Sequence, residues 1–330
     1  MKKIVLITVN RSDYGIQKKL IRLLKKEKKI KLDIIVSGTH LEKKYGNTVN
    51  EIFNDKINIS KKIKIPIQNY NTRNVMKILT KSSLKFFSFY DLVKPDLVIV
   101  LGDRYEMFAA TIPTVFLNIP VAHIHGGEKT LGSFDDNLRN MITEMASLHF
   151  TCHNDYKKRV ISIKNSKKNI YNFGSLSLEE ISKSKFYSRH YLKKKFNIEF
   201  ASKNLLVTYH PETKNINYNN KNFLEILKAI SNFKNVNFFF TLPAPDPGNF
   251  EIIRSIKTFC RKNKNSFFVK SFGREAYFSM LKNVDGVIGN SSSGIIEVPS
   301  FKIPTINIGN RQAGRLLSKS IINCKCKKIK

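Results

Sequence analysis

Charged side chains follow two neighbouring apolar stretches of the chain, at the point where each stretch ends. The stretches are residues 97–101 and 119–124, and glycines stand close to the end of each. Carboxylates and imidazoles transfer protons and guanidinium groups hold anions, so these positions could carry acid–base chemistry on an anionic ligand. The charged residues that follow the two stretches are Asp103, Arg104, His125, Glu128 and Asp135.

Each of these residues alone could be a helix cap or a surface ion pair. Parallel strands, however, bring their carboxyl ends to one edge of a sheet, and the ligands of open α/β sheets bind outside that edge. Glycines beside the charged groups let the backbone approach a ligand closely. The pattern therefore predicts a ligand site along one rim of a sheet, with Arg139 one helical turn beyond Asp135.

Apolar runs of strand length alternate with segments of helical periodicity along most of the chain, which predicts parallel sheets. The first strand, residues 2–10, turns into a helix expected over residues 16–28. The series breaks near the middle of the chain, where a long basic helix is expected up to about Phe196, and then it resumes. We expect an α/β protein with two Rossmann-like, doubly wound domains, residues 1–173 and 174–330, which face each other across an active-site cleft.

The composition is that of a protein with a sizeable core, because 42% of the 330 residues are hydrophobic. A formal net charge of +33 would suit a nucleic-acid or membrane partner. The lysines are spread along the chain, however, and no basic stretch is interleaved with aromatic residues, so we expect neither partner. No apolar stretch reaches the ~18 residues of a membrane span, and the N-terminus is interpreted as a first strand rather than a signal peptide. A cytoplasmic protein is expected.

The four cysteines, at positions 152, 260, 324 and 326, form no CxxC pair and show no metal-ligand spacing with the histidines. Reduced thiols in a cytoplasmic enzyme fit this pattern best, and no metal site is expected. Neither GxGxxG nor GxxxxGK[ST] follows any expected strand, so a dinucleotide site or a P-loop has no support.

The segment Asn-Ser-Ser-Ser-Gly at residues 290–294 lies at an expected strand-to-helix turn. Backbone N–H groups and small hydroxyls at such a turn can hold an anion. The alternative is that one of the serines only caps the helix. Arg311, at the end of the next expected strand, would be a natural partner for a diphosphate.

With these residues in view, the chain resembles the hydrolysing UDP-N-acetylglucosamine 2-epimerases of bacterial sialic and legionaminic acid synthesis. The family is similar in fold to the two-domain GT-B glycosyltransferases, which agrees with the two halves described above. The matching segments occur in the family's order and cover residues 1 to about 315. They are NRSDYG at 10–15, GDRYE at 102–106, HIHGGE at 123–128, GSFDDNLR at 132–139, HPET at 210–213, NSSSG at 290–294 with Glu297, and GNRQ at 309–312.

The resemblance implies a role for each matching charged or polar position. Asp103 would be a catalytic carboxylate, and Glu297 would bind the ribose. Related enzymes often carry a catalytic glutamate where this chain has His125, and Glu128 follows three residues on, so the second acid–base group is left open between these two. The implied catalytic residues are Asp103, His125, Glu128, Asp135, Arg139 and His210, and the implied UDP ligands are Arg11, Gly15, Arg104, His210, Ser291, Ser292, Glu297 and Arg311.

The resemblance also implies the reaction. No carbonyl flanks the C2 proton of an N-acetyl sugar, but breaking the C1–O bond first makes that proton far more acidic. UDP would leave to give a glycal, and water would then add with inversion at C2. The substrate would be UDP-N-acetylglucosamine or UDP-2,4-diacetamido-2,4,6-trideoxyglucose. The expected partner is therefore a UDP-sugar, with no cofactor and no metal, and a homodimer is left open.

The sequence departs from the family's pattern at two further places. Ala244 stands where the family usually has asparagine, and the chain stops after Ser320 in IINCKCKKIK, where family members continue. We therefore expect a basic low-complexity tail and a C-terminal domain that is cut short. Two alternatives to the epimerase stay open: a GT-B glycosyltransferase, which would need an acceptor, and an inactive truncated remnant.

Overall fold

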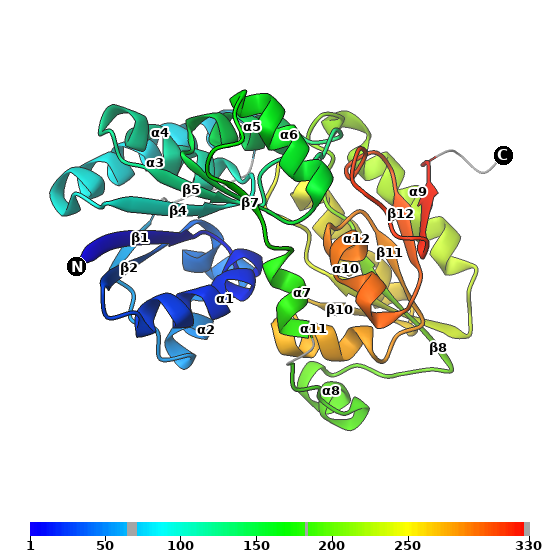
Figure 1. Cartoon of the computed structure of the whole chain (residues 1–330). Helices are drawn as coiled ribbons and strands as arrows, with labels where there is room; N and C mark the ends of the chain where they lie inside the picture. The colour runs from blue at the N-terminus through cyan, green and yellow to red at the C-terminus, as the bar shows by residue number, and fades with distance from the viewer. Residues whose placement is uncertain (65–70, 182–183, 327–330) are drawn as a thin grey trace. The chain divides into compact units, whose positions relative to one another are not determined.

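The computed structural model describes residues 1–64, 71–181 and 184–326, and within them the chain forms two compact units. Unit 1 comprises residues 1–128 and 135–180, and unit 2 comprises residues 129–134 and 181–330. The short segment 129–134 therefore folds with the second half of the chain. Each unit contains one parallel β-sheet with helices on its faces (Figure 1).

The sheet of unit 1 has seven strands in the order β3-β2-β1-β4-β5-β6-β7, and all neighbours run parallel. The order reverses between β1 and β4, because the chain first adds β2 and β3 on one side and then β4 to β7 on the other. The strands are β1 (Lys2–Thr8), β2 (Ile30–Ser37), β3 (Lys61–Ile63), β4 (Leu97–Leu101), β5 (Val121–Ile124), β6 (Leu148–Thr151) and β7 (Ile170–Asn172).

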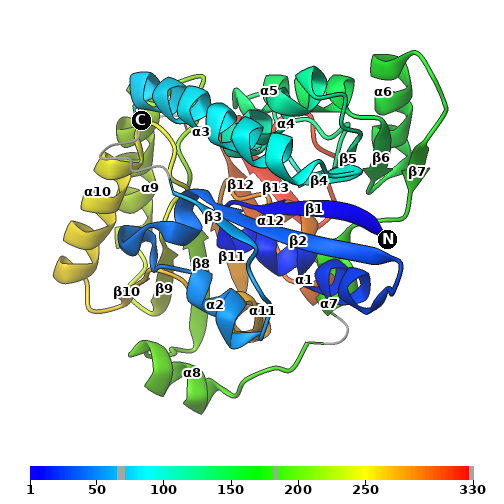
Figure 2. The same ribbon diagram turned by 90° about the vertical axis from the view of Figure 1, so that its left-hand side faces the viewer.

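Helices cover both faces of this sheet. Figures 1 and 2 show α1 and α2 on one face and α3, α4 and α5 on the other. The strands between them are buried on both faces, which is why β1 and β4 are almost continuously apolar. The helices of unit 1 are α1 (Arg11–Lys26), α2 (Val49–Asn54), α3 (Thr72–Val93), α4 (Tyr105–Phe116), α5 (Asp135–Met145), α6 (Asn154–Lys164) and α7 (Leu176–Ile181).

The sheet of unit 2 has six parallel strands in the order β10-β9-β8-β11-β12-β13, with the reversal between β8 and β11. Its strands are β8 (Lys203–Thr208), β9 (Val236–Thr241), β10 (Ser266–Val269), β11 (Gly286–Gly289), β12 (Thr305–Ile308) and β13 (Ile321–Cys324). Its helices are α8 (Arg189–Phe196), α9 (Asn219–Ser231), α10 (Asn249–Lys262), α11 (Arg274–Leu281) and α12 (Ser293–Ile296).

Three consecutive phenylalanines in β9 divide the core of unit 2 between the two faces of its sheet. Phe238 and Phe240 belong to the core cluster that includes residues of α9 and α10. Phe239 belongs to the opposite cluster, with residues of α8 and α11. This alternation follows from the two-residue period of a strand, and it buries three aromatic rings in one short element.

The helix after the first strand begins earlier than the sequence predicts. We expected it from Ile16, but α1 begins at Arg11 because Asn10 caps it, with Asn10 Oδ1 accepting from the N–H of Asp13 at 3.0 Å. The polar segment that follows β2 contains the short helix α2. The edge strand β3 was not predicted, because its two lysines mask the apolar pattern of a strand.

The expected long basic helix up to Phe196 is wrong. The structure has two short helices, α7 and α8, and residues 182–183 of the expected helix lie outside the described residues. Ser188 has an extended backbone and its Oγ accepts from the N–H of Tyr191 at 3.2 Å, which caps a new helix. The N–H of Tyr187 donates to Ser279 Oγ at 2.9 Å, so the backbone here bonds to α11 instead of continuing a helix.

The expected low-complexity tail is also wrong over residues 321–324, which form β13. This strand pairs in parallel with β12, and Ile306 lies opposite Ile322. Asn307 Nδ2 donates to Asn323 Oδ1 at 2.8 Å across the same pair. Residues 327–330 of the expected tail lie outside the described residues.

Among the described residues, every helix falls short of the length and apolar character that crossing a bilayer requires. All four cysteines carry free thiols.

Candidate active site

Predicted site residues lie where the strand order reverses in each sheet. In unit 1, Arg11 comes shortly after β1, and Asp103 comes shortly after β4. In unit 2, His210 comes shortly after β8, and Ser291 comes shortly after β11. The reversal point of a doubly wound sheet is where ligands bind, because the two flanking connections leave in opposite directions.

The first turn of α1 places a buried carboxyl group at the reversal point of unit 1. Asp13 is only 6% exposed, and its Oδ2 has no hydrogen-bond partner among the described residues. Burial raises the pKa of Asp13 to about 7, against the opposing effect of the Arg104 guanidinium. Arg11 and the buried Gly15 lie in the same turn. Asp13 lies inside the NRSDYG segment, but it was not among the predicted site residues.

Arg104 is half-buried just before α4. Its Nε donates to Glu106 Oε2 at 3.2 Å, and its guanidinium lies 4.6 Å from the centre of the Tyr105 ring. Glu106 is 1% exposed, so the ion pair compensates a buried carboxylate. In this arrangement Arg104 has an internal partner, and its contact with a nucleotide stays a prediction.

Arg139 links three acidic or carbonyl groups of unit 1. It is 2% exposed, and its Nη2 forms an ion pair with Asp103. Its Nη1 donates to the carbonyl oxygen of Glu128 at 2.8 Å and lies 3.7 Å from Asp136 Oδ1. A buried guanidinium with these partners fixes the position of Asp103 and of the chain at Glu128. The catalytic role that the family resemblance implies for Arg139 stays a prediction.

A second arginine, which the sequence analysis missed, strengthens the same cluster. Arg159 of α6 donates from Nη1 to the carbonyl oxygen of Glu128 at 2.7 Å and from Nη2 to Asp136 Oδ2 at 3.4 Å. Two guanidinium groups therefore converge on one carbonyl. The position of Arg159 on a helix that follows the motifs gave no sign of this contact.

Asp135 and Asp136 begin α5, and both are buried, at 3% and 5% exposure. The first turn of a helix favours carboxylates because its N–H groups and its dipole present positive charge. The contacts of Asp136 with Arg139 and Arg159 explain one of the two buried carboxylates. The catalytic role of Asp135 stays a prediction.

His125, Glu128 and Cys152 form a buried cluster after β5 and β6. His125 Nδ1 and Glu128 Oε1 are 2.7 Å apart, and the Cys152 thiol donates to the same oxygen at 3.1 Å. Burial lowers the pKa of His125, but Glu128 and Cys152 outweigh it and raise this pKa to about 10. Burial raises the pKa of the Cys152 thiol. Because Glu128 Oε1 also accepts from the Cys152 thiol, His125 Nδ1 is the donor in its contact with this oxygen.

The backbone of this turn is tightly constrained. His125 has a φ of +66°, a left-handed conformation that is uncommon outside glycine. A Cβ on Gly127 would collide with the carbonyl oxygen of Tyr156, so only glycine fits at that position. Gly127 thus helps to place His125 and Glu128 side by side.

His210 of unit 2 is held by Asn290. Asn290 Oδ1 accepts from the N–H of His210 at 2.6 Å, and its Nδ2 donates to the carbonyl oxygen of the same residue at 2.8 Å. The N–H of Ala244 donates to His210 Nδ1 at 2.8 Å, which leaves the proton of the neutral ring on Nε2. Ala244, the departure noted in the sequence, therefore contributes through its backbone.

The serines of unit 2 lie immediately after Asn290. Ser291 and Ser292 are half-buried before α12, which is only four residues long, and Glu297 follows its end. Arg311 Nη1 and Gln312 Nε2 donate to the carbonyl oxygen of Asn290 at 3.3 Å and 2.9 Å. Asn290 thus joins the ends of β8, β11 and β12, although it was not among the predicted site residues. The UDP contacts of these residues stay predictions.

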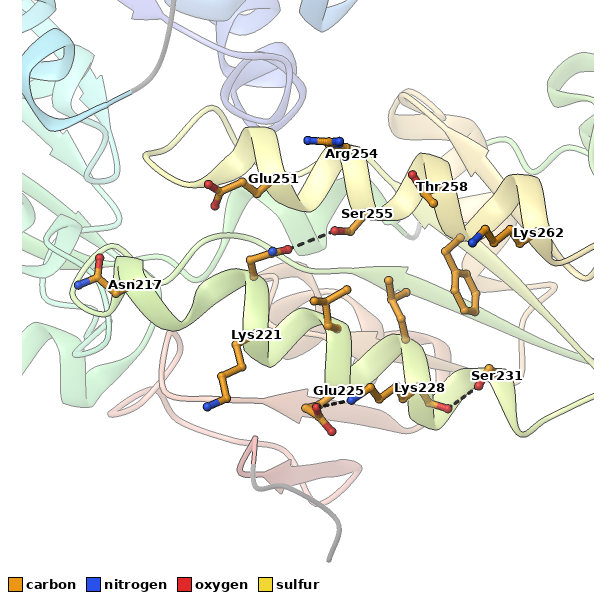
Figure 3. A pocket seen from close by; sticks show the side chains of 14 residues that line it. Asn217, Lys221, Glu225, Lys228, Ser231, Glu251, Arg254, Ser255, Thr258 and Lys262 are labelled. Atoms are coloured by element: carbon orange, nitrogen blue, oxygen red, sulfur yellow. Dashed lines mark hydrogen bonds and ion pairs between the residues drawn. The ribbon is translucent and has the colours of Figure 1, made fainter.

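Unit 2 also has an open groove of about 1080 Å³ between α9 and α10 (Figure 3). Its described lining includes none of the predicted site residues, and it bears cations and carboxylates in alternation. Glu225 accepts from Lys228 at 2.9 Å across one turn of α9, which is typical of a solvated helix face. The groove is therefore separate from the predicted site.

Comparisons with known proteins match nearly the whole chain. A family model described as UDP-N-acetylglucosamine 2-epimerase matches residues 22–330. The chain is 40% identical over 324 residues to the polysialic acid biosynthesis protein P7 of Escherichia coli, which covers 98% of this chain and 82% of that protein. It is 35% identical over 323 residues to the GDP/UDP-N,N'-diacetylbacillosamine 2-epimerase (hydrolyzing) of Campylobacter jejuni, with 98% and 84% covered.

The fold is similar to that of solved epimerase structures. The Methanocaldococcus jannaschii UDP-GlcNAc 2-epimerase, solved in complex with UDP-GlcNAc and UDP, matches with a TM-score of 0.77 at 18% identity. The match covers 99% of this chain and 90% of that chain. This likeness, with the two parallel sheets, confirms the predicted fold class of an α/β, GT-B-like protein with two Rossmann-like domains.

Proposed function

Because the chain belongs to the UDP-N-acetylglucosamine 2-epimerase family, we propose that it releases UDP from a UDP-linked N-acetyl sugar and frees that sugar in the manno configuration. The predictions of this family and of a hydrolysing epimerase are confirmed by the family model and by the two relatives. The observation that carries the proposed chemistry is the buried cluster in which Arg139 holds Asp103 and the backbone of Glu128.

We assign the substrate to UDP-sugars that carry an N-acetyl group on C2. The name of the C. jejuni relative supports a diacetylated sugar, UDP-2,4-diacetamido-2,4,6-trideoxyglucose, and that of the E. coli relative supports a route to a sialic acid polymer. UDP-N-acetylglucosamine is the second candidate, and the M. jannaschii structure contains it. Both sugars would undergo the same inversion at C2 and would supply nonulosonic acid synthesis.

The acid–base steps fall to the groups of unit 1. Loss of UDP requires removal of the C2 proton, which needs a carboxylate base, and addition of water requires a second proton transfer. Asp103 is half-buried and anchored by Arg139. Because His125 donates to Glu128, the two titrate as one pair, and we assign the second acid–base role to this pair rather than to either residue alone. Each positioned acid or base contributes on the order of 10²–10⁴-fold in rate.

The nucleotide contacts fall to polar groups near the strand ends. The neutral ring of His210 carries its proton on Nε2, which can donate to a phosphate oxygen of the leaving UDP. Ser291 and Ser292 offer hydroxyls, Arg311 offers charge, and Glu297 offers an acceptor for ribose hydroxyls. Arg11 and Gly15, in the first turn of α1, are assigned to the diphosphate on the family resemblance.

We also propose a cytoplasmic location, on the support of four free thiols, and a UDP-sugar as the partner, without nucleic acid or a membrane. The homodimer left open by the sequence stays a prediction, which sedimentation of the purified protein would test.

The proposal is tested by incubating the purified chain with each of the two UDP-sugars in the absence of any acceptor. We expect release of UDP together with a free manno-configured sugar from at least one of them. A glycosyltransferase would require an acceptor for turnover, so UDP release only on adding an acceptor would overturn the proposal in favour of that alternative. UDP binding without turnover under any condition would favour the inactive remnant.

A further inference from the structure

Three potential metal ligands converge in unit 1, although one of them, Cys152, lies 24 residues from Glu128 in the sequence. One ligand atom each of His125, Glu128 and Cys152 lies within 4.8 Å of the other two. His125 follows β5, and Cys152 follows β6, the neighbouring strand of the sheet. The spacing of cysteines and histidines along the chain gave no sign of this cluster, because the pairing of the two strands alone brings it together.

We propose that His125, Glu128 and Cys152 form a binding site for a borderline-soft divalent cation such as Zn²⁺. Zinc takes thiolate, imidazole and carboxylate ligands, and a site with three protein ligands leaves a fourth position open for water or substrate. Thiolate and imidazole ligands together disfavour Mg²⁺ and Ca²⁺, which prefer oxygen.

Hydrogen bonds hold the three side chains together, and each of these bonds carries a proton in the place that a bound cation would take. Glu128 Oε1 lies 2.7 Å from His125 Nδ1 and 3.1 Å from Cys152 Sγ, and His125 also interacts with Cys152. On binding, one cation displaces the proton that His125 Nδ1 and Glu128 share and the thiol proton of Cys152, and both protons are released to solvent. The resulting thiolate and carboxylate carry two negative charges, which match the charge of Zn²⁺.

The positions of the three side chains are fixed before any cation binds. The left-handed backbone of His125 and the steric limit at Gly127 define the turn, and two arginines hold the carbonyl oxygen of Glu128. His125 Nε2 is buried and has no hydrogen-bond partner among the described residues, so a cation bound at Nδ1 breaks no hydrogen bond of Nε2. A preorganised set of ligands is what tight metal binding requires.

Occupation of this site would inhibit the epimerase, and this consequence rests on the proposed function. The cation would take the carboxylate of Glu128 and the imidazole of His125 away from proton transfer. The binding itself does not depend on the function, so it can be measured on the full chain without any substrate.

The binding test uses Co²⁺ as a coloured substitute for Zn²⁺, because a cobalt–thiolate bond gives a near-ultraviolet charge-transfer band. We expect the wild-type chain to show this band at one equivalent of Co²⁺ and to lose it when Zn²⁺ is added. Cys152→Ser should abolish the band and weaken Zn²⁺ binding by at least about 10–100-fold, since losing a ligand costs no less than losing an outer-shell partner. Zinc affinity is measured by competition with a chromogenic chelator.

The matched control is the double variant Cys324→Ser with Cys326→Ser, which removes two exposed or half-buried thiols elsewhere and should leave the band unchanged. If Cys152→Ser does not fold, His125→Asn serves in its place, because asparagine tolerates the left-handed backbone and is a poor zinc ligand. A band that persists without Cys152 or His125, or that disappears in the double variant, would overturn the site.

The functional arm compares UDP release with and without Zn²⁺. We expect Zn²⁺ to inhibit the wild-type chain reversibly, and a chelator to relieve the inhibition. In Cys152→Ser the rate with Zn²⁺ should be close to the rate without Zn²⁺. Metal binding without inhibition would contradict the regulatory consequence while leaving the site intact. An inactive wild-type chain that still binds Co²⁺ through Cys152 would count against the proposed function alone.

Discussion

Replacing Asp13 with asparagine should remove a pH dependence from the stability of the protein. Burial raises the pKa of Asp13 from 3.8 to about 7 in the folded chain. A raised carboxyl pKa means that the folded state binds the proton more tightly than the unfolded state does. This contribution to stability is therefore complete below about pH 4, falls as the pH rises, and is lost once the pH has passed about 7.

The size of the effect follows from the gap between the two pKa values. The gap is about three pKa units, and one unit corresponds to about 1.4 kcal/mol, so the whole effect is roughly 4 kcal/mol. The unfolded carboxyl group ionises near pH 4. By pH 5 the protein has therefore already lost the part of this stabilisation that corresponds to about one pKa unit. The remaining two units correspond to about 3 kcal/mol of unfolding free energy between pH 5 and pH 8.

The assay is urea unfolding followed by circular dichroism at several pH values, for the wild-type chain and for Asp13→Asn. The free energy of unfolding of the wild-type chain relative to the variant should fall by about 3 kcal/mol from pH 5 to pH 8. Asp96→Asn is the control, because the hydrogen bond from the Lys3 N–H lowers the pKa of Asp96 below its ordinary value of 3.8. Its contribution to stability is lost only as the pH falls below about 4, so the wild-type-minus-variant difference for Asp96 should stay constant from pH 5 to pH 8. A wild-type-minus-variant difference that stays flat over this range would refute the burial argument for Asp13.

Three further substitutions test other parts of the account. Asp103→Asn should lower the rate of UDP release by on the order of 10²–10⁴-fold with UDP binding retained, while Asp136→Asn, which also contacts Arg139, should lose far less activity. Asn290→Ala should cost about 1–3 kcal/mol of stability and weaken UDP binding in calorimetry, because both backbone groups of His210 lose their partner. Gly289→Ala should lower the free energy of unfolding in urea by at least about 2 kcal/mol, because the added Cβ would collide with the backbone of Thr208. A variant as stable as the wild type would contradict the close approach of β11 to β8.

The fold could be predicted from the sequence because its elements repeat a simple pattern. Strands such as β1 and β4 are buried on both faces, so they appear as short, almost continuous apolar runs. Two strands were not predicted because charged residues mask their apolar pattern. They are β3, which is lysine-rich and lies at an edge of its sheet, and β13, which lies in a basic tail. The assignment of residues 129–134 to unit 2 was not predicted either. It depends on tertiary contacts such as the hydrogen bond from the Phe134 N–H to Thr213 Oγ1 at 2.9 Å.

The part of the candidate site that could be predicted consists of residues that are close together in the sequence as well as in the structure. His125 and Glu128 lie three residues apart, and the glycines between them mark a constrained turn. Cys152 and Arg159 also contact Glu128, but Cys152 follows the next strand and Arg159 belongs to the next helix, so nothing near His125 in the sequence points to them. Their contribution depends on the pairing of β5 with β6 and on the packing of α6, which are tertiary features.

The central claim, elimination of UDP followed by rehydration, is tested most directly by proton NMR of the reaction in heavy water. If a carboxylate removes the C2 proton and water returns one to the opposite face, the freed manno-configured sugar carries deuterium at C2. The account predicts complete deuteration of the product at that carbon. A product that keeps its C2 proton, or one with the original configuration at C2, would contradict it.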